Sequence, residues 1–351
     1  MSVAMDVLAG LEATTLWQEK LYKDLHQHPE LSMQEVRTRG VIRQRLESFG
    51  YATQEIGGGV VGVLFNGEGP TVLVRADIDA LPVTEATGLD YASATVGVMH
   101  ACGHDTHIVC GLGAAELLSQ GRDAWAGTYI TLFQPGEETA AGARAMVGDG
   151  LVGKIPRPTV CLAQHVLGSP EAGHVATTAG PVLSAADSLR ITVHGKGSHG
   201  SMPHLGVDPV VLAASIVVRL QTIVSRVLAP DEFGVVTVGS LQSGSTANII
   251  PDRAELLVNV RTYDPDVRER VIAAIERIVR SECEAAGSPQ DPEFASYDTF
   301  PLTDNDAEPT AIVTAAFRQH FGEDRVHHMA PATASEDFSV IPDAFGVPYT
   351  Y

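Results

Sequence analysis

Apolar residues recur with two different periods along the chain, and the periods predict helices and strands in an ordered succession. From Thr14 to Phe49 they recur at helical spacing with a break at Pro29, so two helices are predicted. Three later segments are apolar runs of the kind that form buried strands: 71–83, 128–138 and 159–166. The segment 107–120 predicts a helix between the first two. This alternation is typical of an α/β fold, with a mostly parallel sheet and helices on both faces.

The pattern changes after position 183. A half-buried strand is predicted at 188–198 and further strands at 234–244, 247–264 and 293–300. Helices with proline near their starts are predicted at 208–228 and 265–287. The order is β-α-β-β-α-β, which is the signature of a ferredoxin-like sandwich. Because the residues after position 300 resume the pattern of the first 183, we expect one domain at 1–183 and 300–351, interrupted by an inserted ferredoxin-like domain at 184–299.

Charge and composition exclude some partners. The 351 residues include 23 Lys+Arg and 43 Asp+Glu, a formal net charge of −20, which argues against nucleic acid or an anionic membrane as a partner. No apolar run approaches the roughly 20 residues of a membrane span. The first residues have no basic segment of the signal-peptide type, and the four cysteines show no CxxC spacing. We therefore expect a cytoplasmic protein with reduced thiols.

The segment "MHACGHDTH" contains the first candidate site. Cys102 and His104 are two residues apart, so in an extended or turn segment they project to the same side and can chelate a divalent metal. Asp105 and His107 are candidates for orienting an imidazole. A cysteine nucleophile activated by His104 is the less favoured alternative, because a one-residue gap makes proton transfer awkward.

Two further clusters follow predicted strands. In "LFQPGEE" the neighbouring side chains of Glu137 and Glu138 diverge, so one carboxylate is suited to bind a metal and the other to act as general base. His165 lies at the end of the predicted strand 159–166 and is either a ligand or a core histidine. Polar residues at the ends of parallel strands are where open α/β sheets bind ligands.

The inserted segment offers candidates for substrate binding. Arg261 lies on a predicted strand and suits a substrate carboxylate, and His199 and Asn248 suit a polarised carbonyl. Each of these residues alone is more often structural. The sequence has no GxxxxGK[ST] or GxSxG motif and no GxGxxG motif after a strand, so phosphate binding and hydride transfer have no motif support.

Together these motifs resemble the metal-dependent aminoacylase and carboxypeptidase family, in its amidohydrolase branch. That branch includes hippurate hydrolases, N-acyl-amino-acid amidohydrolases and indoleacetyl-amino-acid hydrolases. The matching stretches span positions 26 to 338 in order: "HQHPELSMQE", "RADIDALPVTE", "MHACGHDTH", "LFQPGEE", "HGKGSHGSMPH", "ANIIPDRAELLVNVRTYD" and "ASEDFS".

The resemblance implies a catalytic domain that binds two divalent ions, drawn from zinc, manganese, cobalt and nickel. It implies Cys102 as the bridging ligand, with His104, Glu138 and His165 as further ligands. Glu137 is then the general base and Asp77 an orienting residue. The resemblance also implies that the inserted domain is a lid that mediates a homodimer or homotetramer. His199, Asn248 and Arg261 then reach the substrate from this lid, and the histidine comes in some dimers from the neighbouring subunit.

The expected reaction is hydrolysis of the amide bond of a small N-acyl-amino acid. A dipeptidase or a desuccinylase-like hydrolase is an alternative with the same chemistry. A catalytically impaired binding protein is another, because the family supplies a last histidine ligand after "ASEDFS". His327 and His328 precede that motif and the sequence stops at Tyr351, so we expect the C-terminal part of the catalytic domain to be truncated.

Overall fold

The computed structural model describes residues 3–351, which form two compact units. Unit 1 comprises the described residues up to Val182, with Thr303–Pro331 and Glu336–Tyr351, and unit 2 comprises Leu183–Leu302 and Ala332–Ser335. The sequence did not anticipate that Ala332–Ser335 groups with unit 2. The roles of the units as catalytic domain and lid stay predictions.

Unit 1 is built on a six-stranded sheet with the order β1-β2-β4-β3-β5-β16. Its strands are β1 (Ala52–Ile56), β2 (Gly59–Asn66), β3 (Thr71–Asp77), β4 (Gly127–Gln134), β5 (Val160–Ala163) and β16 (Tyr349–Thr350). β3 is parallel to β4 and β5, and β16 is parallel to β5, which confirms a mainly parallel sheet. The sequence analysis missed the antiparallel hairpin β1-β2, whose two-residue turn is Gly57-Gly58 with φ of 55° and 88°.

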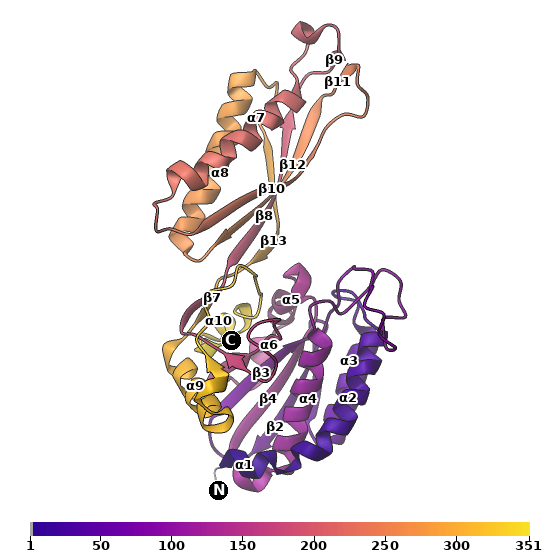
Figure 1. Cartoon of the computed structure of the whole chain (residues 1–351), viewed down its shortest axis with the longest axis vertical. Helices are drawn as coiled ribbons and strands as arrows, with labels where there is room; N and C mark the ends of the chain where they lie inside the picture. Colours follow the sequence, from indigo (N-terminus) through magenta and orange to yellow (C-terminus); the bar gives the residue numbers. More distant parts are fainter. Residues whose placement is uncertain (1–2) are drawn as a thin grey trace. The chain divides into compact units, whose positions relative to one another are not determined.

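Helices cover both faces of this sheet, as predicted (Figure 1). One face packs against α2 (Leu11–Gln27), α3 (Val36–Ser48) and α4 (His104–Gln120), and the other against α5 (Gly142–Gly148), α6 (Leu151–Lys154) and α10 (Val340–Phe345). The smaller elements of unit 1 are α1 (Val3–Val7), β6 (Val175–Ala176), β14 (Thr303–Asn305), α9 (Ala307–Phe321) and β15 (Val326–His327), and β7 (Gly180–Leu183) runs from unit 1 into unit 2. Each face therefore has its own apolar core, formed by side chains of alternating strand positions.

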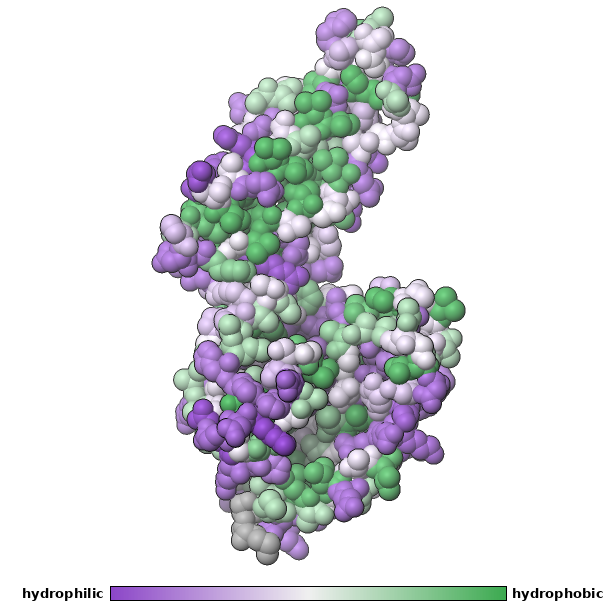
Figure 2. Space-filling model, viewed as in Figure 1, coloured by the Kyte–Doolittle hydropathy of each residue, from purple (hydrophilic) through white to green (hydrophobic). Residues whose placement is uncertain are grey.

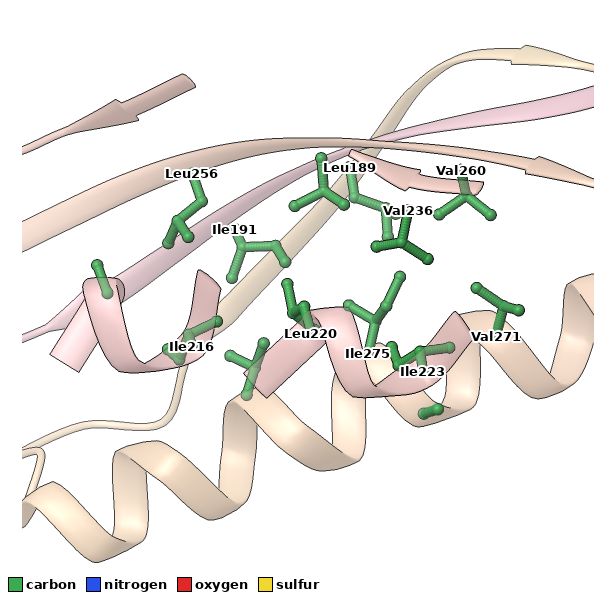
Figure 3. Packing of buried hydrophobic residues seen from close by; sticks show 14 of the residues in the cluster. Leu189, Ile191, Ile216, Leu220, Ile223, Val236, Leu256, Val260, Val271 and Ile275 are labelled. Carbon is green, nitrogen blue, oxygen red and sulfur yellow. The ribbon is translucent and has the colours of Figure 1, made fainter. Parts of the chain in front are cut away.

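Unit 2 has an antiparallel four-stranded sheet with the order β10-β12-β8-β13. Its elements follow the predicted βαββαβ order: β8 (Ala185–His194), α7 (Pro209–Thr222), β10 (Gly234–Gln242), β12 (Arg253–Thr262), α8 (Pro265–Ala286) and β13 (Glu293–Phe300). The helices pack on one face of the sheet around side chains such as Ile191, Leu220 and Ile275 (Figure 3). Asp208 and Asp264 cap the two helices through their side chains, which explains the sharp Asp-Pro starts.

One helical stretch, Pro209–Val227, is long and apolar enough to cross a membrane by length and composition, which the sequence analysis overlooked. A core helix of a globular domain passes the same test, and the inward side chains of this one pack in the unit 2 core. Only 28% of the stretch is buried, so much of its apolar surface lies exposed.

Several helices and strands begin or end at other residues than predicted, and the differences lie at the ends that carry polar residues. The helix predicted from 107 begins at His104, and the strand predicted to 138 ends at Gln134, followed by the 3-10 turn η3 (Glu137–Thr139). The strand predicted at 159–166 spans Val160–Ala163, so His165 lies in the loop beyond it. The strand predicted at 247–264 is split at Pro251, which separates β12 from β11 (Ile249–Ile250), the partner of β9 (Ser198–His199).

Candidate metal centre

The candidate ligands lie at the carboxyl edge of the unit 1 sheet. β4 leads through a left-handed Gly136 (φ 55°) into η3, which carries Glu137 and Glu138. β5 leads into the loop with His165, and Gly103 (φ 86°) places His104 as the first residue of α4. The sheet therefore collects residues that are up to 63 positions apart in sequence.

The four predicted ligands come together in space. The Cys102 Sγ lies 3.4 Å from the His165 Nε2. The His104 Nε2 lies 3.9 Å from the Glu138 Oε1. The donor atoms of Cys102, His104 and His165 all lie within 4.8 Å of one another, as do those of His104, Glu137 and Glu138.

The chemistry of these residues fits a divalent transition metal. The Nε2 of His104 and the Oε1 of Glu138 are buried and find no hydrogen-bond partner among the described residues, whereas the Nδ1 of His104 faces the Oδ1 of Asp79 at 3.3 Å. Buried polar atoms are normally satisfied, so unpaired lone pairs that converge at one point indicate a ligand. A thiol, two imidazoles and a carboxylate are the donor types that bind zinc and its neighbours.

The surroundings of the candidate ligands are strongly acidic. Burial lowers the pKa of His104, but the charges of Asp77 and Asp79 outweigh it and hold that pKa well above its usual value. Burial lowers the pKa of His165, which favours the neutral ring that a metal requires. Burial raises the pKa of Glu138, and the negative charges of Asp79 and Asp77 act in the same direction. A bound cation would relieve this excess of negative charge.

Asp77, the predicted orienting residue, lies beside the ligands. Its Oδ1 lies 2.5 Å from the Nδ1 of His107, and its Oδ2 lies 3.6 Å from the Nε2 of His104. The Nη1 of Arg75 donates to the Oδ2 of Asp77 at 2.7 Å. Asp77 is thus held between an arginine and two histidines, with no exposed surface.

Glu137, the predicted general base, lies in a pocket of carboxylates. Burial raises the pKa of Glu137 well above its usual value, and the charges of Glu336 and Asp337 act in the same direction. Donor atoms of Glu137, Glu336 and Asp337 lie within 4.8 Å of one another. A carboxyl with a raised pKa and only 5% exposure is a stronger base than an exposed carboxylate, which suits it to accept and return a proton.

The sequence analysis did not single out four of the residues that build this site. Arg75 binds Glu336 through its Nη2 at 2.6 Å, and Asp337 accepts from Gln134 and from the backbone N–H of Ala143. Asp79 accepts from the backbone N–H groups of Glu137 and Glu138, at 3.1 Å each, and fixes the η3 turn. The stretches "RADIDALP" and "ASEDFS" stand out as motifs, but nothing in their spacing shows that they meet.

The predicted substrate residues lie in unit 2, and the structure does not bring all three together. His199 and Asn248 are neighbours at the exposed antiparallel strand pair β9–β11, where the Gly200 N–H donates to the Asn248 carbonyl. Arg261 lies near the opposite end of β12, where its Nη1 donates to the Thr333 carbonyl and the Ser335 hydroxyl. Arg261 lies eight positions along β12 from Arg253, a span of about 26 Å, and the β9–β11 strand pair lies beyond Arg253.

Comparison with known proteins shows which family has this fold. The model of peptidase family M20/M25/M40 matches residues 73–351. The chain belongs to this family. It is 37% identical to the N-acetyl-L-cysteine deacetylase of Bacillus subtilis over 330 residues, which cover 92% of this chain and 78% of the relative. It is 36% identical to the hippurate hydrolase of Campylobacter jejuni over 91% of this chain and 83% of the relative.

Solved structures of the family have the same architecture. A dinuclear metal-binding M20 peptidase of Bacillus subtilis is 31% identical, with a TM-score of 0.79 over 97% of this chain and 88% of that chain. This M20 chain is accordingly a hydrolase with a metal-binding fold. The resemblance to this family that the sequence motifs indicated is confirmed.

Proposed function

We propose that this M20 protein hydrolyses the amide bond of small N-acyl-amino acids in a metal-dependent reaction. The convergence of Cys102, His104, Glu138 and His165 beside the buried Glu137 is the observation that carries the proposal. The names of relatives support the substrate class, since they include an N-acetyl-L-cysteine deacetylase and an N-acyl-L-amino acid amidohydrolase.

In this proposal the thiol, the two imidazoles and the Glu138 carboxylate hold divalent ions, drawn from zinc, manganese, cobalt and nickel. Such ions, when bound, acidify water and polarise the scissile carbonyl. Glu137 takes the proton of the attacking water and returns it to the leaving amine, which its high pKa favours. Asp77, which Arg75 holds by a hydrogen bond, lies 3.6 Å from the Nε2 of His104 and in this proposal orients that ring through its charge.

Unit 2 provides the substrate contacts in this proposal. Arg261 binds the substrate carboxylate, and His199 and Asn248 bind the carbonyl. An N-acyl-amino acid is about two residues long, roughly 7 Å, whereas Arg261 and the β9–β11 strand pair are about 26 Å apart. One chain therefore cannot apply both ends of its unit 2 to one substrate. This separation supports a homodimer in which His199 and Asn248 serve the site of the second copy.

The exposed side of α7 supports the same assembly. Val211 and Val218 are 62% and 71% exposed, and Figure 2 shows hydrophobic residues along this face of unit 2. Contiguous apolar surface of this kind is typical of a protein–protein interface.

Light scattering should show a dimer for the wild type and a monomer for Val218→Asp. Val152→Asp, at an exposed valine of unit 1, is the matched control. A monomeric wild type contradicts the proposal, and a tetramer extends it.

We also propose that the protein works in a reducing compartment, the cytoplasm. The support is that its cysteines Cys102, Cys110, Cys161 and Cys283 are all free.

Glu137→Gln is the direct test of the mechanism. The variant should lose about 100-fold to 10,000-fold in kcat on N-acetyl-amino acids while it retains bound metal, since glutamine cannot carry the proton. The neighbouring Glu138→Gln is the matched control and should lose metal as well as activity. A Glu137→Gln enzyme with the parental rate and metal content refutes the assignment.

A panel that adds dipeptides and N-succinyl compounds separates the amidase from the dipeptidase and desuccinylase alternatives. Metal binding without hydrolysis of any of them indicates the impaired binding protein.

A further inference from the structure

His107 lies among the candidate ligands but is not itself free to bind a metal. Its donor atoms lie within 4.8 Å of those of Asp77 and His104, and the ring is buried, with 2% exposure. Its Nδ1 faces the Oδ1 of Asp77 at 2.5 Å, and its Nε2 faces the backbone N–H of Val166 at 2.8 Å. Both ring nitrogens are therefore already engaged.

These two partners determine the tautomer of His107. A backbone N–H can only donate, so the Nε2 of His107 must be the acceptor. The ring proton must then be on Nδ1, where it is donated to the carboxylate of Asp77. With its Nε2 lone pair directed at Val166, His107 has no lone pair left for a cation.

The same residue, Val166, also determines the tautomer of His165. The Nδ1 of His165 lies 2.6 Å from the Val166 carbonyl oxygen, so it carries the proton and donates it. The Nε2 of His165 is thereby left as a lone pair, 3.4 Å from the Cys102 Sγ. Val166 is thus held through its N–H by His107 and through its carbonyl by His165.

We propose that His107 is a positioning residue, which anchors the His165 loop through the backbone of Val166 and so aims the His165 Nε2 at the metal. The proposal rests on the proposed function, since it assumes that His165 is a ligand. His165 lies beyond the end of β5, where no strand pairing holds it. The edge of one ring packs against the other, with centroids 4.6 Å apart and planes at 73°, which restricts the rotation of His165. Outer partners of this kind typically change metal affinity 10-fold to 100-fold.

Two substitutions separate the bonds of His107. The amide of His107→Gln reaches the position of Nε2, so its oxygen can accept from Val166. The shorter amide of His107→Asn reaches only the position of Nδ1, so it can donate to Asp77 but leaves the Val166 N–H without an acceptor. Ile108→Ala is the matched control, because Ile108 is equally buried on α4 but belongs to the apolar core.

The measurement is the dissociation constant of Zn²⁺ by competition with a chelating dye, on full-length protein whose fold is checked by circular dichroism. We expect His107→Asn to bind Zn²⁺ about 10-fold to 100-fold more weakly than the wild type. His107→Gln should bind with affinity close to the wild type, and so should Ile108→Ala despite its lower stability. Equal affinity of the Asn variant and the wild type overturns the proposal, and so does equal loss in the Asn and Gln variants.

A second measurement needs no variant to fold. Nitrogen NMR of ¹⁵N-histidine-labelled wild-type protein should show a neutral His107 ring protonated on Nδ1, before and after Zn²⁺ is added. A ring protonated on Nε2 overturns the proposal. If the wild type binds no Zn²⁺ at all, it is the proposed function that fails, and the NMR result still reports the His107 tautomer separately.

Discussion

Removal of the Arg75 side chain tests the buried network behind the site. Arg75 has only 1% exposure, and its guanidinium donates to Asp77 at 2.7 Å, to both oxygens of Glu336 at 2.6 and 3.1 Å, and to Gln134 at 2.9 Å. Arg75→Met keeps much of the volume but leaves buried carboxylates without a positive partner. Breaking a buried ion pair from one side costs about 3–5 kcal/mol. Against a typical stability of about 5–15 kcal/mol, this loss should leave unit 1 marginal.

Tryptophan fluorescence in a urea titration of metal-free protein is a suitable assay. The only two tryptophans, Trp17 and Trp125, both lie in unit 1, so the signal reports the unfolding of that unit. Arg190→Met is the control, because Arg190 forms a solvent-exposed pair with Glu255 and such pairs contribute little. An Arg75→Met protein that unfolds within about 1 kcal/mol of the wild type would refute the argument that this ion network stabilises unit 1.

Three further outcomes follow from the structure. Burial raises the pKa of Asp337 to about 8, so the folded metal-free protein holds a proton that the unfolded chain releases near pH 4. Stability should thus fall as pH rises from about 4 to 8, and urea titrations of Asp337→Asn should show a flatter dependence. Asp208→Ala removes the cap on α7 and should lower the stability of unit 2 by about 1 kcal/mol, measurable by calorimetry, with Asp231→Ala as the control in a neighbouring loop. Chelators should abolish hydrolysis and lower the melting temperature, and Zn²⁺ should restore both; unchanged activity in excess chelator would argue for the cysteine-nucleophile alternative.

The fold was largely predictable because its signals are local. The apolar runs of β3, β4 and β5 and the Asp-Pro starts of α7 and α8 are visible in short stretches of sequence. The β1-β2 hairpin was missed because its signal is a glycine pair, which reads as a loop unless the left-handed conformation of Gly57 and Gly58 is known. Strand ends were placed too late at Gln134 and Ala163, where the chain leaves the sheet to present polar groups.

The candidate site was predictable only in the residues proposed to contact the metal or the water. Cys102, His104, Glu137 and Glu138 stand in short motifs with metal-ligand spacing, so their chemistry can be read without coordinates. Arg75 and Glu336 are 261 residues apart, and no periodicity connects them. The bond from Val166 to His107 involves a backbone N–H, which leaves no trace in the residue types.

The absorption spectrum of the Co²⁺-loaded protein tests most directly whether Cys102 and its neighbours bind a divalent cation. The wild type should show a thiolate-to-cobalt charge-transfer band, which Cys102→Ser abolishes and Cys110→Ser, at a cysteine outside the cluster, leaves intact. Absence of the band from the wild type, or its persistence in Cys102→Ser, would contradict the account.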